Sequence, residues 1–392
     1  MRFQVRVLSS ISDVAPEEWD AVAGARAVPF IRWGWLHALE ASNSAVAARG
    51  WEAAHLTCWR AERLVAAAPC WVKSHSMGEY IYDFGWADAA RQIGVRYYPK
   101  LVIGVPLGPI ASPKLLVREG EDADAARAAL VSAARELAAE RRCSSIHGLF
   151  LDEGEAAAMA AAGFTRRLTL QFHWSNPGYG SYEDFLSRFT SKRRHQLRRE
   201  RAAATEQGVT IATIRGDALR AEHAERAWRF YEATNMKNPW GRVQLTRDFF
   251  TRAFKAFPQN VEVVEARRGD QVIAGAFNVA SGDRLFGRYW GALEEVPFLH
   301  FNVCLYHSID ECIRLGKKVF EPGAGGEHKI ARGFEPTAIH SAHLIFDKRL
   351  NRAIRAFCEE ERAEHEALLA RREEIAGLKP WTRDQAAPTA GR

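Results

Sequence analysis

The stretch VEVVEARRGDQVIAGAFNVASGDRLFGRYWGA, residues 261–292, decides the fold of this chain. Three runs rich in β-branched and aromatic residues alternate with two turns in which a glycine precedes an aspartate. The runs are 261–267, 271–280 and 284–292, and the turns are 268–270 and 281–283. Such turns are strong hairpin signals. The stretch therefore predicts an antiparallel meander of three strands.

Helices and further strands flank this meander. Before it we expect a helical arm at 181–206, a strand at 209–215, and helices at 221–237 and 246–257. After it we expect a helix at 301–315 that ends at Gly316, strands at 317–321 and 337–346, and a charged helix from about 348 to 376. Glycine commonly ends a helix. The pattern of the second half therefore predicts a domain in which strands and helices are mixed.

The first half repeats this order in coarse form. Its expected elements are strand 3–8, helices 16–24 and 29–40, a hairpin at 53–73, a strand near 100–105, helix 122–141, strand 144–150, helix 153–162 and strand 166–174. Asp122 and Asp124 offer N-terminal capping chemistry to the Ala-rich helix. The pattern predicts a duplicated α/β protein.

Composition limits the class of protein. The chain has 392 residues, enough for two ordinary domains, and its 47% hydrophobic and 26% charged residues are typical of a globular protein. No apolar run approaches the ~20 residues of a membrane span. The six cysteines are scattered without metal-ligand spacing. We expect a cytoplasmic protein with reduced thiols, no metal site and no membrane span.

A glycine-rich loop follows the expected strand 317–321. Three glycines fall within residues 323–326, and Glu327, His328 and Lys329 come directly after them. Glycine lets the backbone take positive φ and approach a ligand closely, and α/β folds usually place ligands at the carboxyl ends of strands. We interpret Glu327, His328 and Lys329 as catalytic. A surface turn with solvated charges is the alternative.

Positive charge is concentrated in residues 191–201. This segment holds six Lys or Arg residues against one Glu, so its net +5 is nearly the whole formal excess of +6. An anionic partner such as a phosphate, a nucleotide or tRNA, contacted through Lys192 and Arg193, is the functional interpretation. A solvated helix face is the alternative.

Several motifs in one order carry a family resemblance. They are Tyr97-Tyr98-Pro99-Lys100-Leu101, Val105-Pro106-Leu107-Gly108-Pro109, Gln171-Phe172-His173-Trp174, Ser191-Lys192-Arg193-Arg194, Gly287-Arg288-Tyr289-Trp290-Gly291-Ala292, Leu299-His300-Phe301 and Gly325-Gly326-Glu327-His328-Lys329. On these, from about Leu8 to Glu361, the chain resembles the FemAB-like N-acyltransferases, often described as peptidoglycan biosynthesis/recognition proteins.

The resemblance implies an α/β (α+β) fold of tandem GNAT-like acyltransferase domains, each a mixed, mostly antiparallel twisted sheet flanked by helices. The expected N-terminal domain is 1–178. The C-terminal domain is 179–346 with the basic arm 181–206, followed by a helix at 347–378 and a disordered tail at 379–392. The implied activity is N-acyl or aminoacyl transfer to an amine acceptor, with a cell-wall precursor peptide as that acceptor.

The acyl donor stays open between aminoacyl-tRNA and acyl-CoA, and no permanently bound cofactor is expected. Acetyl-CoA enzymes hold the pyrophosphate on the amides of a glycine-rich loop. Residues 291–298 occupy that place here, with two carboxylates and a proline, which disfavours CoA. Besides an enzyme that uses acyl-CoA or an acyl carrier, a non-catalytic protein that binds an anionic ligand in a degenerate cleft is the remaining alternative.

Site residues are assigned by the chemistry of acyl transfer. A base must take the amine proton, so either Glu327 or His328 serves, while Lys329 stabilises the oxyanion or a leaving phosphate. The expected substrate-binding residues are Arg332, His300, Arg288, Tyr289, Trp290, His173, Trp174 and Lys100. Arg332 is expected to clamp a phosphate by its planar fork. In the strand, Arg288 and Trp290 are expected on one face and Tyr289 on the other.

Overall fold

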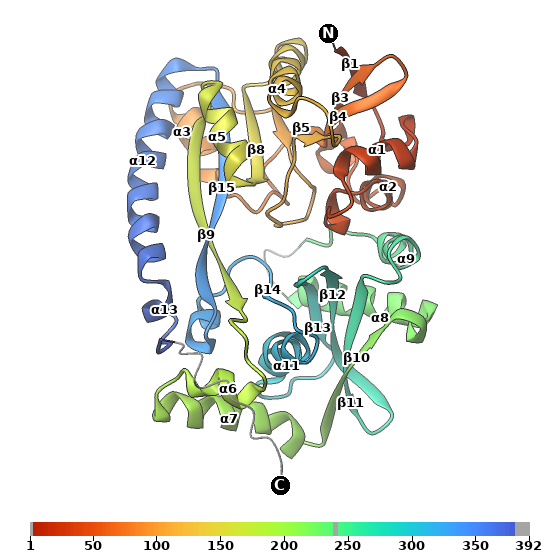
Figure 1. Cartoon of the computed structure of the whole chain (residues 1–392), viewed down its shortest axis with the longest axis vertical. Coiled ribbons are helices and arrows are strands. Elements are labelled where there is room, and N and C mark those ends of the chain that lie inside the picture. Colours follow the sequence, from red (N-terminus) through yellow and green to blue (C-terminus); the bar gives the residue numbers. More distant parts are fainter. Residues whose placement is uncertain (1–2, 238–241, 381–392) are drawn as a thin grey trace. The chain divides into compact units, whose positions relative to one another are not determined.

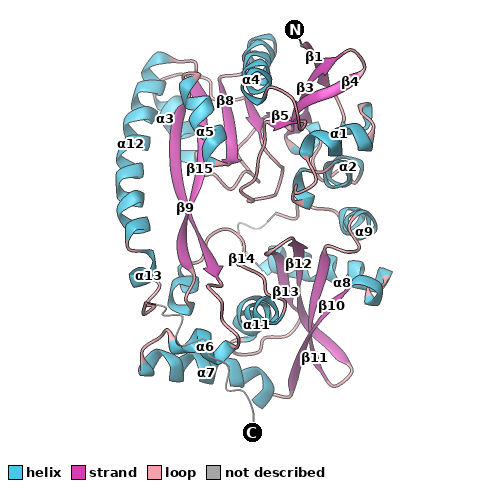
Figure 2. Ribbon diagram, viewed as in Figure 1, coloured by secondary structure: helices cyan, strands magenta, loops and turns pink. Residues whose placement is uncertain are grey.

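The computed structural model describes residues 3–237 and 242–380 (Figures 1 and 2). They divide into two compact units, one drawn from Met1–Leu170, Gln244–Phe249 and Ala338–Glu366, the other from Gln171–Val243, Phe250–Thr337 and Ala367–Arg392. Both units mix strands with helices, so the predicted α/β class is confirmed. No helix among the described residues is long and apolar enough to cross a membrane.

The first unit holds two sets of paired strands. One has the order β1-β3-β4-β7, all antiparallel, and the other contains β2-β5-β6-β8-β15, in which β6 and β8 are parallel. Their bounds are β1 Gln4–Leu8, β2 Trp51–Ala53, β3 His55–Arg60, β4 Arg63–Ala68, β5 Cys70–Lys73, β6 Lys100–Ile103, β7 Leu116–Val117, β8 Ser145–Leu151 and β15 Glu335–Ile345.

Helices cover these strands. They are α1 Pro16–Ala23, α2 Trp33–Ala41, α3 Phe84–Gln92, α4 Ala123–Glu140, α5 Glu153–Ala161 and α12 Lys348–Ala370. The Asp122 side chain caps α4 by accepting from the Ala125 amide at 3.1 Å, as its sequence position predicts. Small and branched residues on one face of α4, such as Ala126, Leu130 and Ala134, pack into the main core with residues of β3, β4 and β8. Alanine allows this close approach of helix and sheet.

The second unit contains the predicted meander. Strands β10 (Val209–Arg215), β11 (Val261–Arg268), β12 (Gln271–Ser281) and β13 (Arg284–Ala292) pair antiparallel in chain order. Gly269 and Gly282 take φ 57° and 55° in the two hairpin turns, which is the conformation that glycine favours. Strand β14 (Val319–Glu321) runs parallel to β13, and β9 (Thr165–Ser175) pairs antiparallel with β14.

The helices of this unit are α6 Tyr182–Ser187, α7 Ser191–Glu206, α8 Ala221–Lys237, α9 Arg247–Ala256 and α13 Arg372–Ile375, with α10 Leu299–Phe301, a π-helical turn Asn302–Tyr306 and α11 His307–Arg314 in direct succession. Helix α8 lies very close to the sheet. A Cβ on Gly291 would stand 1.9 Å from the Phe230 carbonyl oxygen, so only glycine allows this contact.

Strands β13 and β14 pair over three residues only. Their register joins Arg284–Phe286 to Val319–Glu321, while β13 continues to Ala292. After Glu321 the chain turns into the glycine loop instead of continuing the ladder. The outer half of β13 therefore has no strand on this side, and the space beside it is left to side chains.

Some elements differ from the sequence prediction. The division into units places 338–366 with the first unit, whereas the predicted domains were the continuous segments 1–178 and 179–346. The arm 181–206 is broken between α6 and α7, and the helix predicted at 301–315 begins at Leu299. Helix α3 was not predicted. Of the predicted tail 379–392, residues 381–392 lie outside the described residues.

Candidate active site

The glycine loop has the backbone geometry that its composition predicts. Gly323, Gly325 and Gly326 take φ of 92°, 71° and 92°, which residues with a Cβ rarely adopt. A Cβ on Gly326 would also meet the His328 ring at 2.7 Å. The loop leads into a 3-10 helix, Glu327–Arg332, that carries the predicted catalytic residues. The glycines thus turn the chain sharply at the end of β14.

Lys329 is the buried member of this group. It is 5% exposed, and its Nζ donates to the carbonyl oxygens of Gly323 and Gly325 at 2.7 Å each. Burial, and next the charge of Arg288, lower the pKa of Lys329 to about 8. The ammonium therefore stays largely charged at neutral pH while it holds the loop closed. Among the described residues, no ion pair joins Lys329 to Glu327, which is exposed.

Lys329 lines a small inner chamber of about 100 Å³. The other lining residues are Ala276, Asn278, Gly287, Arg288, Tyr289, Trp290, His300, Cys304, Leu305 and Pro322. Two of the eleven lining side chains, Lys329 and Arg288, are cationic. Fixed positive charge in a chamber of this size suits an oxygen that becomes negative during a reaction.

A β-bulge directs Arg288 into this chamber. The register of β12 and β13 shifts from Phe277 opposite Tyr289 to Asn278 opposite Gly287, so Arg288 is the additional residue. A bulge interrupts the alternation of side chains and re-aims one of them. The Tyr289 ring stacks on Phe277 and lies 5.0 Å from the Tyr231 ring, whereas the Trp290 ring lies 4.7 Å from the His300 ring. Tyr289 and Trp290 therefore take opposite faces of the strand, as predicted.

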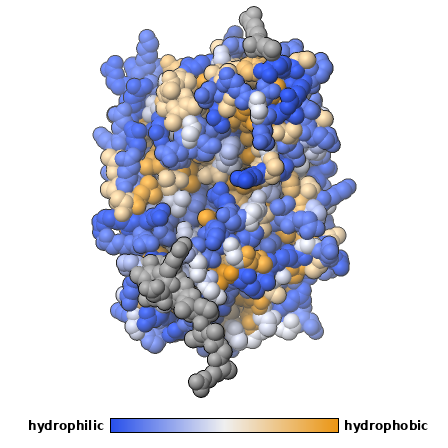
Figure 3. Space-filling view, viewed as in Figure 1, coloured by the Kyte–Doolittle hydropathy of each residue, from blue (hydrophilic) through white to orange (hydrophobic). Residues whose placement is uncertain are grey.

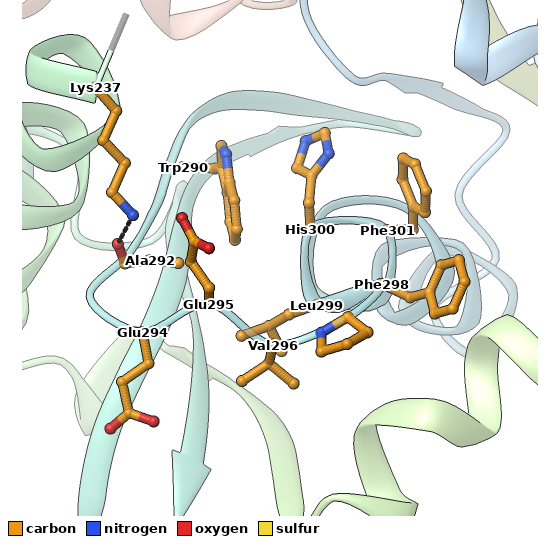
Figure 4. Close-up of a pocket in the computed structure, with 11 residues that line it drawn as sticks. Lys237, Trp290, Ala292, Glu294, Glu295, Val296, Phe298, Leu299, His300 and Phe301 are labelled. Atoms are coloured by element: carbon orange, nitrogen blue, oxygen red, sulfur yellow. Dashed lines mark hydrogen bonds between the residues drawn. The ribbon is translucent and has the colours of Figure 1, made fainter.

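A larger outer pocket of about 640 Å³ lies at the start of the helix that begins at Leu299 (Figure 4). It is lined by Lys237, Trp290, Ala292, Glu294, Glu295, Val296, Pro297, Phe298, Leu299, His300 and Phe301. Trp290 and His300 line both cavities, and their ring centroids are 4.7 Å apart. These two rings therefore stand between the outer pocket and the inner chamber.

The two carboxylates of the outer pocket point in opposite directions in Figure 4. Glu294 pairs with Arg268 at 2.5 Å, whereas Glu295 is exposed at the pocket. Lys237 Nζ donates to the Ala292 carbonyl at 3.3 Å. Burial lowers the pKa of His300 to about 4, so its imidazole is neutral at pH 7. The pocket lining is mainly apolar, and its charged members are Lys237, the paired Glu294 and the exposed Glu295.

Arg332 is occupied by other protein groups. Its Nη2 lies 2.6 Å from Glu200 Oε2, its Nε donates to the Tyr306 hydroxyl at 2.8 Å, and its Nη1 donates to the His328 carbonyl at 2.8 Å. It is 7% exposed, and its guanidinium lies 3.4 Å from the Phe301 ring centroid. This placement differs from the predicted phosphate clamp, because the planar fork already holds a carboxylate.

His328 lies beside the aromatic wall of the site. Its ring centroid is 5.6 Å from that of His300 and 5.5 Å from that of Phe301. Burial, followed by the charges of Lys329 and Arg332, lowers the pKa of His328. A neutral imidazole that is partly open to solvent can accept a proton at physiological pH.

His173 and Trp174, on β9, do not line either cavity. His173 is buried, with its Nε2 3.9 Å from Glu321 Oε2, and burial together with Arg284 and Arg288 lowers its pKa to about 3. Trp174 is fully buried among aromatic core residues. The sequence placed both in a cleft, but the hydrophobic core includes this end of β9.

Lys100 lies in the first unit and is fully buried. Its ammonium donates to Glu79 at 2.8 Å, to Ser76 at 2.9 Å, and to Asp83. A side chain without solvent exposure does not contact a substrate in this arrangement. Its predicted substrate contact is therefore replaced by a buried ionic cluster.

The basic arm forms helix α7. Lys192 is exposed, Arg193 is half-buried and donates to Gln196 at 2.9 Å, and Arg198 pairs with Glu183 at 2.5 Å. On the inner side of the helix Glu200 is 2% exposed and reaches Arg332. Helix α7 therefore combines an outer cationic face with one inward carboxylate.

Sequence reasoning missed Glu200, Tyr306 and Glu321. Glu200 is three residues after the buried Leu197 and four before the buried Ala204, a helical stripe that the sequence shows. Glu321 is fully buried at the end of β14, where Arg284 pairs with its carboxylate and Arg288 donates to its carbonyl at 3.3 Å. The sequence indicated Glu321 only as a single carboxylate at the end of a short apolar strand.

The six cysteines, all among the described residues, are free, and five of them are buried. Within residues 3–237 and 242–380 no cluster of His, Cys, Asp or Glu has the arrangement of a metal site.

The chain belongs to the FemAB-like family, whose model, described as peptidoglycan biosynthesis/recognition, matches residues 10–380. It is similar to the crystal structure of FemX, at 12% identity over 87% of this chain and 98% of the other, with a TM-score of 0.51. It is also similar to L-PGS from Bacillus licheniformis, at 9% identity over 92% and 98%, with a TM-score of 0.50. No curated protein matches the sequence. The tandem GNAT-like fold class is confirmed.

Proposed function

We propose that this protein is an N-acyltransferase that passes an acyl or aminoacyl group to an amine acceptor. The observation that carries the proposal is the chamber beside the unpaired half of β13, into which Lys329 and Arg288 converge. The family description and the similarity in fold to FemX and L-PGS support transfer chemistry in cell-wall or lipid synthesis. A peptidoglycan precursor peptide with a free amine is the acceptor that we propose.

In the proposed reaction, the donor carbonyl lies in the inner chamber with its oxygen toward Lys329 and Arg288. The amine attacks the carbonyl carbon, the new N–C bond forms, and the positive charges stabilise the oxyanion. His328 or Glu327 takes the proton from the amine. The bond to the leaving oxygen then breaks, and that oxygen receives a proton.

Arg332 has a positioning part in this scheme. Its Nη1 holds the His328 carbonyl, and its Nη2 is held by Glu200. The side chain of His328 is therefore presented from a backbone that is fixed on one side by a buried ion pair. We propose that Arg332 orients the glycine loop, and that exposed residues of α7, not Arg332, contact the phosphates of the donor.

Aminoacyl-tRNA is the donor that we favour over acyl-CoA. We propose that the donor enters at the outer pocket, where the exposed carboxylate of Glu295 would repel a pyrophosphate, while Glu294 is paired with Arg268. Exposed cations on α7, among them Lys192 and Arg199, offer phosphate contacts that an RNA donor would use. An acyl-CoA or acyl-carrier donor is the competing proposal.

A donor screen tests the function. The purified chain is incubated with a lysine-containing precursor peptide and, in turn, with charged tRNA and acyl-CoA donors, and mass spectrometry detects the acylated peptide. We expect product with a tRNA donor, and its loss in the Lys329→Ala variant. Ligand that is retained through purification without turnover for any donor would instead identify a binding protein.

A further inference from the structure

Helices α3 and α12 of the first unit pack together and leave a joint outer surface, which we call the α3–α12 surface. Their contact is a buried cluster of Trp86, Ala90, Tyr97, Ile345, Leu350, Ile354 and Cys358. Outside it lie five large apolar side chains that are 41–63% exposed: Tyr82, Phe84, Ile93, Phe346 and Phe357. Figure 3 shows hydrophobic surface among hydrophilic atoms on the flank where Figure 1 draws α12.

Three of these aromatic side chains are held in place. The rings of Tyr82 and Phe84 stack at 6.1 Å, and the Phe357 ring lies 6.4 Å from Trp86. The Arg167 guanidinium lies 5.5 Å from the Phe357 ring and donates to the Tyr82 carbonyl at 2.8 Å. The patch is therefore a preformed feature of the first unit.

Charge on α12 is divided along the helix. Its first eleven residues, 348–358, contain Lys348, Arg349, Arg352 and Arg355 and no acidic residue. The segment that follows contains five acidic residues, Glu359, Glu360, Glu361, Glu364 and Glu366, and one cation, Arg362. All four cations of the first eleven residues are exposed. Arg349, Ala353 and Phe357 follow one another at intervals of four residues, so they lie on one outer face of the helix, and Arg352 lies beside them.

The acidic groups beside this basic half include the exposed Glu359 and Glu360, which follow Phe357 within one turn, and Glu361, which pairs with Arg167. Asp347 lies 3.8 Å from Arg349, and Asp88 of α3 pairs with Arg91 at 3.0 Å. Arg96 adds another exposed cation beside the end of α3. Positive charge thus predominates on the first half of α12, between Phe346 and Phe357, and negative charge follows Phe357.

We propose that the α3–α12 surface binds the headgroup layer of an anionic lipid bilayer, so that the protein attaches to a membrane peripherally. Aromatic rings favour the interface between water and hydrocarbon, and each Lys or Arg close to an anionic surface attracts its phosphates. The buried face of α12 packs on its own unit through Leu350 and Ile354. The exposed face is therefore free to lie on the headgroups without unfolding.

Vesicle sedimentation with the full chain tests the charges. The two vesicle types are phosphatidylcholine alone, and phosphatidylcholine with phosphatidylglycerol in equal parts. We expect binding to the anionic vesicles only, weakening with salt. Arg349→Gln with Arg352→Gln should reduce partitioning roughly 30-fold, since each cation at such a surface contributes about fivefold. Lys255→Gln with Lys318→Gln, two exposed cations of the other unit, is the charge-matched control and should change it little.

The rings have their own test. Phe84→Ser with Phe357→Ser should weaken binding even in high salt, because the apolar contribution is not screened. Thermal unfolding checks that both double variants stay folded. Equal binding to neutral vesicles, or an equal loss in the control pair, overturns the proposal. Retained vesicle binding together with lost RNA binding in the Arg349/Arg352 variant would reassign the surface to nucleic acid.

Discussion

Glu200 Oε2 lies 2.6 Å from Arg332 Nη2, and this ion pair joins the basic helix α7 to the short helix that carries Lys329. The Tyr306 hydroxyl also donates to Glu200 and accepts from Arg332 Nε at 2.8 Å. The side chains of Glu200 and Arg332 are 3% and 8% exposed. The single acidic residue of a strongly basic segment is therefore its connection to the candidate active site.

Removing this carboxylate should destabilise the protein. Glu200→Ala leaves Arg332 buried without its partner, and breaking such a pair costs about 3–5 kcal/mol. Urea unfolding of the variant measures the loss. Glu183→Ala, on α6, removes the exposed partner of Arg198, which lies on the same helix as Glu200. As the control it should cost far less, because an exposed pair contributes little to stability. Equal effects in the two variants would contradict the role of Glu200.

The same ion pair predicts a pH dependence. Burial alone would raise the pKa of Glu200, but hydrogen bonds from Tyr306, Gln196 and Arg332 outweigh it, and the pKa is lowered. Its contribution to stability is therefore complete above about pH 4.3, the ordinary value for Glu, and is lost as the pH falls through the lower folded pKa. The difference in unfolding free energy between wild type and Glu200→Ala should shrink in acid.

Lys329 should be necessary for turnover. Lys329→Ala is expected to lower kcat by roughly 100-fold or more, the usual effect of losing one oxyanion donor. Lys329→Arg should recover little, because a planar fork does not reproduce a point charge that is held by two carbonyls. Since the pKa of Lys329 is lowered to about 8, wild-type activity should decline above that pH. A variant with near-normal turnover would make the glycine loop structural.

The base can be identified by comparing two variants. His328→Ala and Glu327→Gln each remove one candidate, and both side chains are exposed enough for the fold to tolerate the change. The variant that lacks the base should lose roughly 100-fold in kcat. If His328 is the base, its lowered pKa places the acidic limb of the wild-type pH profile below pH 6.5, and His328→Ala removes that limb. A normal profile in both variants would assign proton transfer to solvent.

Much of the second unit could be predicted because its signals are local. The turns at Gly269 and Gly282, the helix end at Gly316 and the positive φ of Gly323 and Gly326 all follow from nearby residues. The bulge at Arg288 could not be predicted, because it depends on the register between β12 and β13. Burial of Trp174 and Lys100 likewise depends on partners far along the chain.

The candidate site could be predicted in part for the same reason. Lys329, His328 and His300 stand in contiguous motifs, and the structure brings them together. The ion pair between Glu200 and Arg332 spans 132 residues, and no local pattern reports such a contact. Helical periodicity marked Glu200 as inward-facing without naming its partner.

Acetyl-CoA should not bind in the usual manner. The segment between β13 and the helix at Leu299 contains Glu294, Glu295 and Pro297. Carboxylates repel a pyrophosphate, and proline lacks the amide N–H that would donate to it. We expect no saturable heat in calorimetry at millimolar acetyl-CoA, with desulfo-CoA as a second ligand. Micromolar affinity would support the acyl-CoA alternative. In that case the Glu295→Gln variant, which lacks the exposed carboxylate, should bind acetyl-CoA more tightly than the wild type does.

Affinity for RNA should depend on the outer face of α7. Lys192 and Arg193 lie near the start of the helix and Arg198 one to two turns later, and Arg198 is exposed even though it pairs with Glu183. Phosphate contacts release counterions, so affinity for tRNA should fall steeply with salt. Changing Lys192, Arg193 and Arg198 to Ala should flatten the slope of log affinity against log salt by roughly one unit for each lost contact. The thermal midpoint should change little, because the stabilising carboxylate of this helix is Glu200 on its other side.

Lys255→Gln with Lys318→Gln is the control for net charge and should keep the wild-type slope. A triple variant with an unchanged slope would leave α7 as a solvated face that is held in place by Glu200 alone.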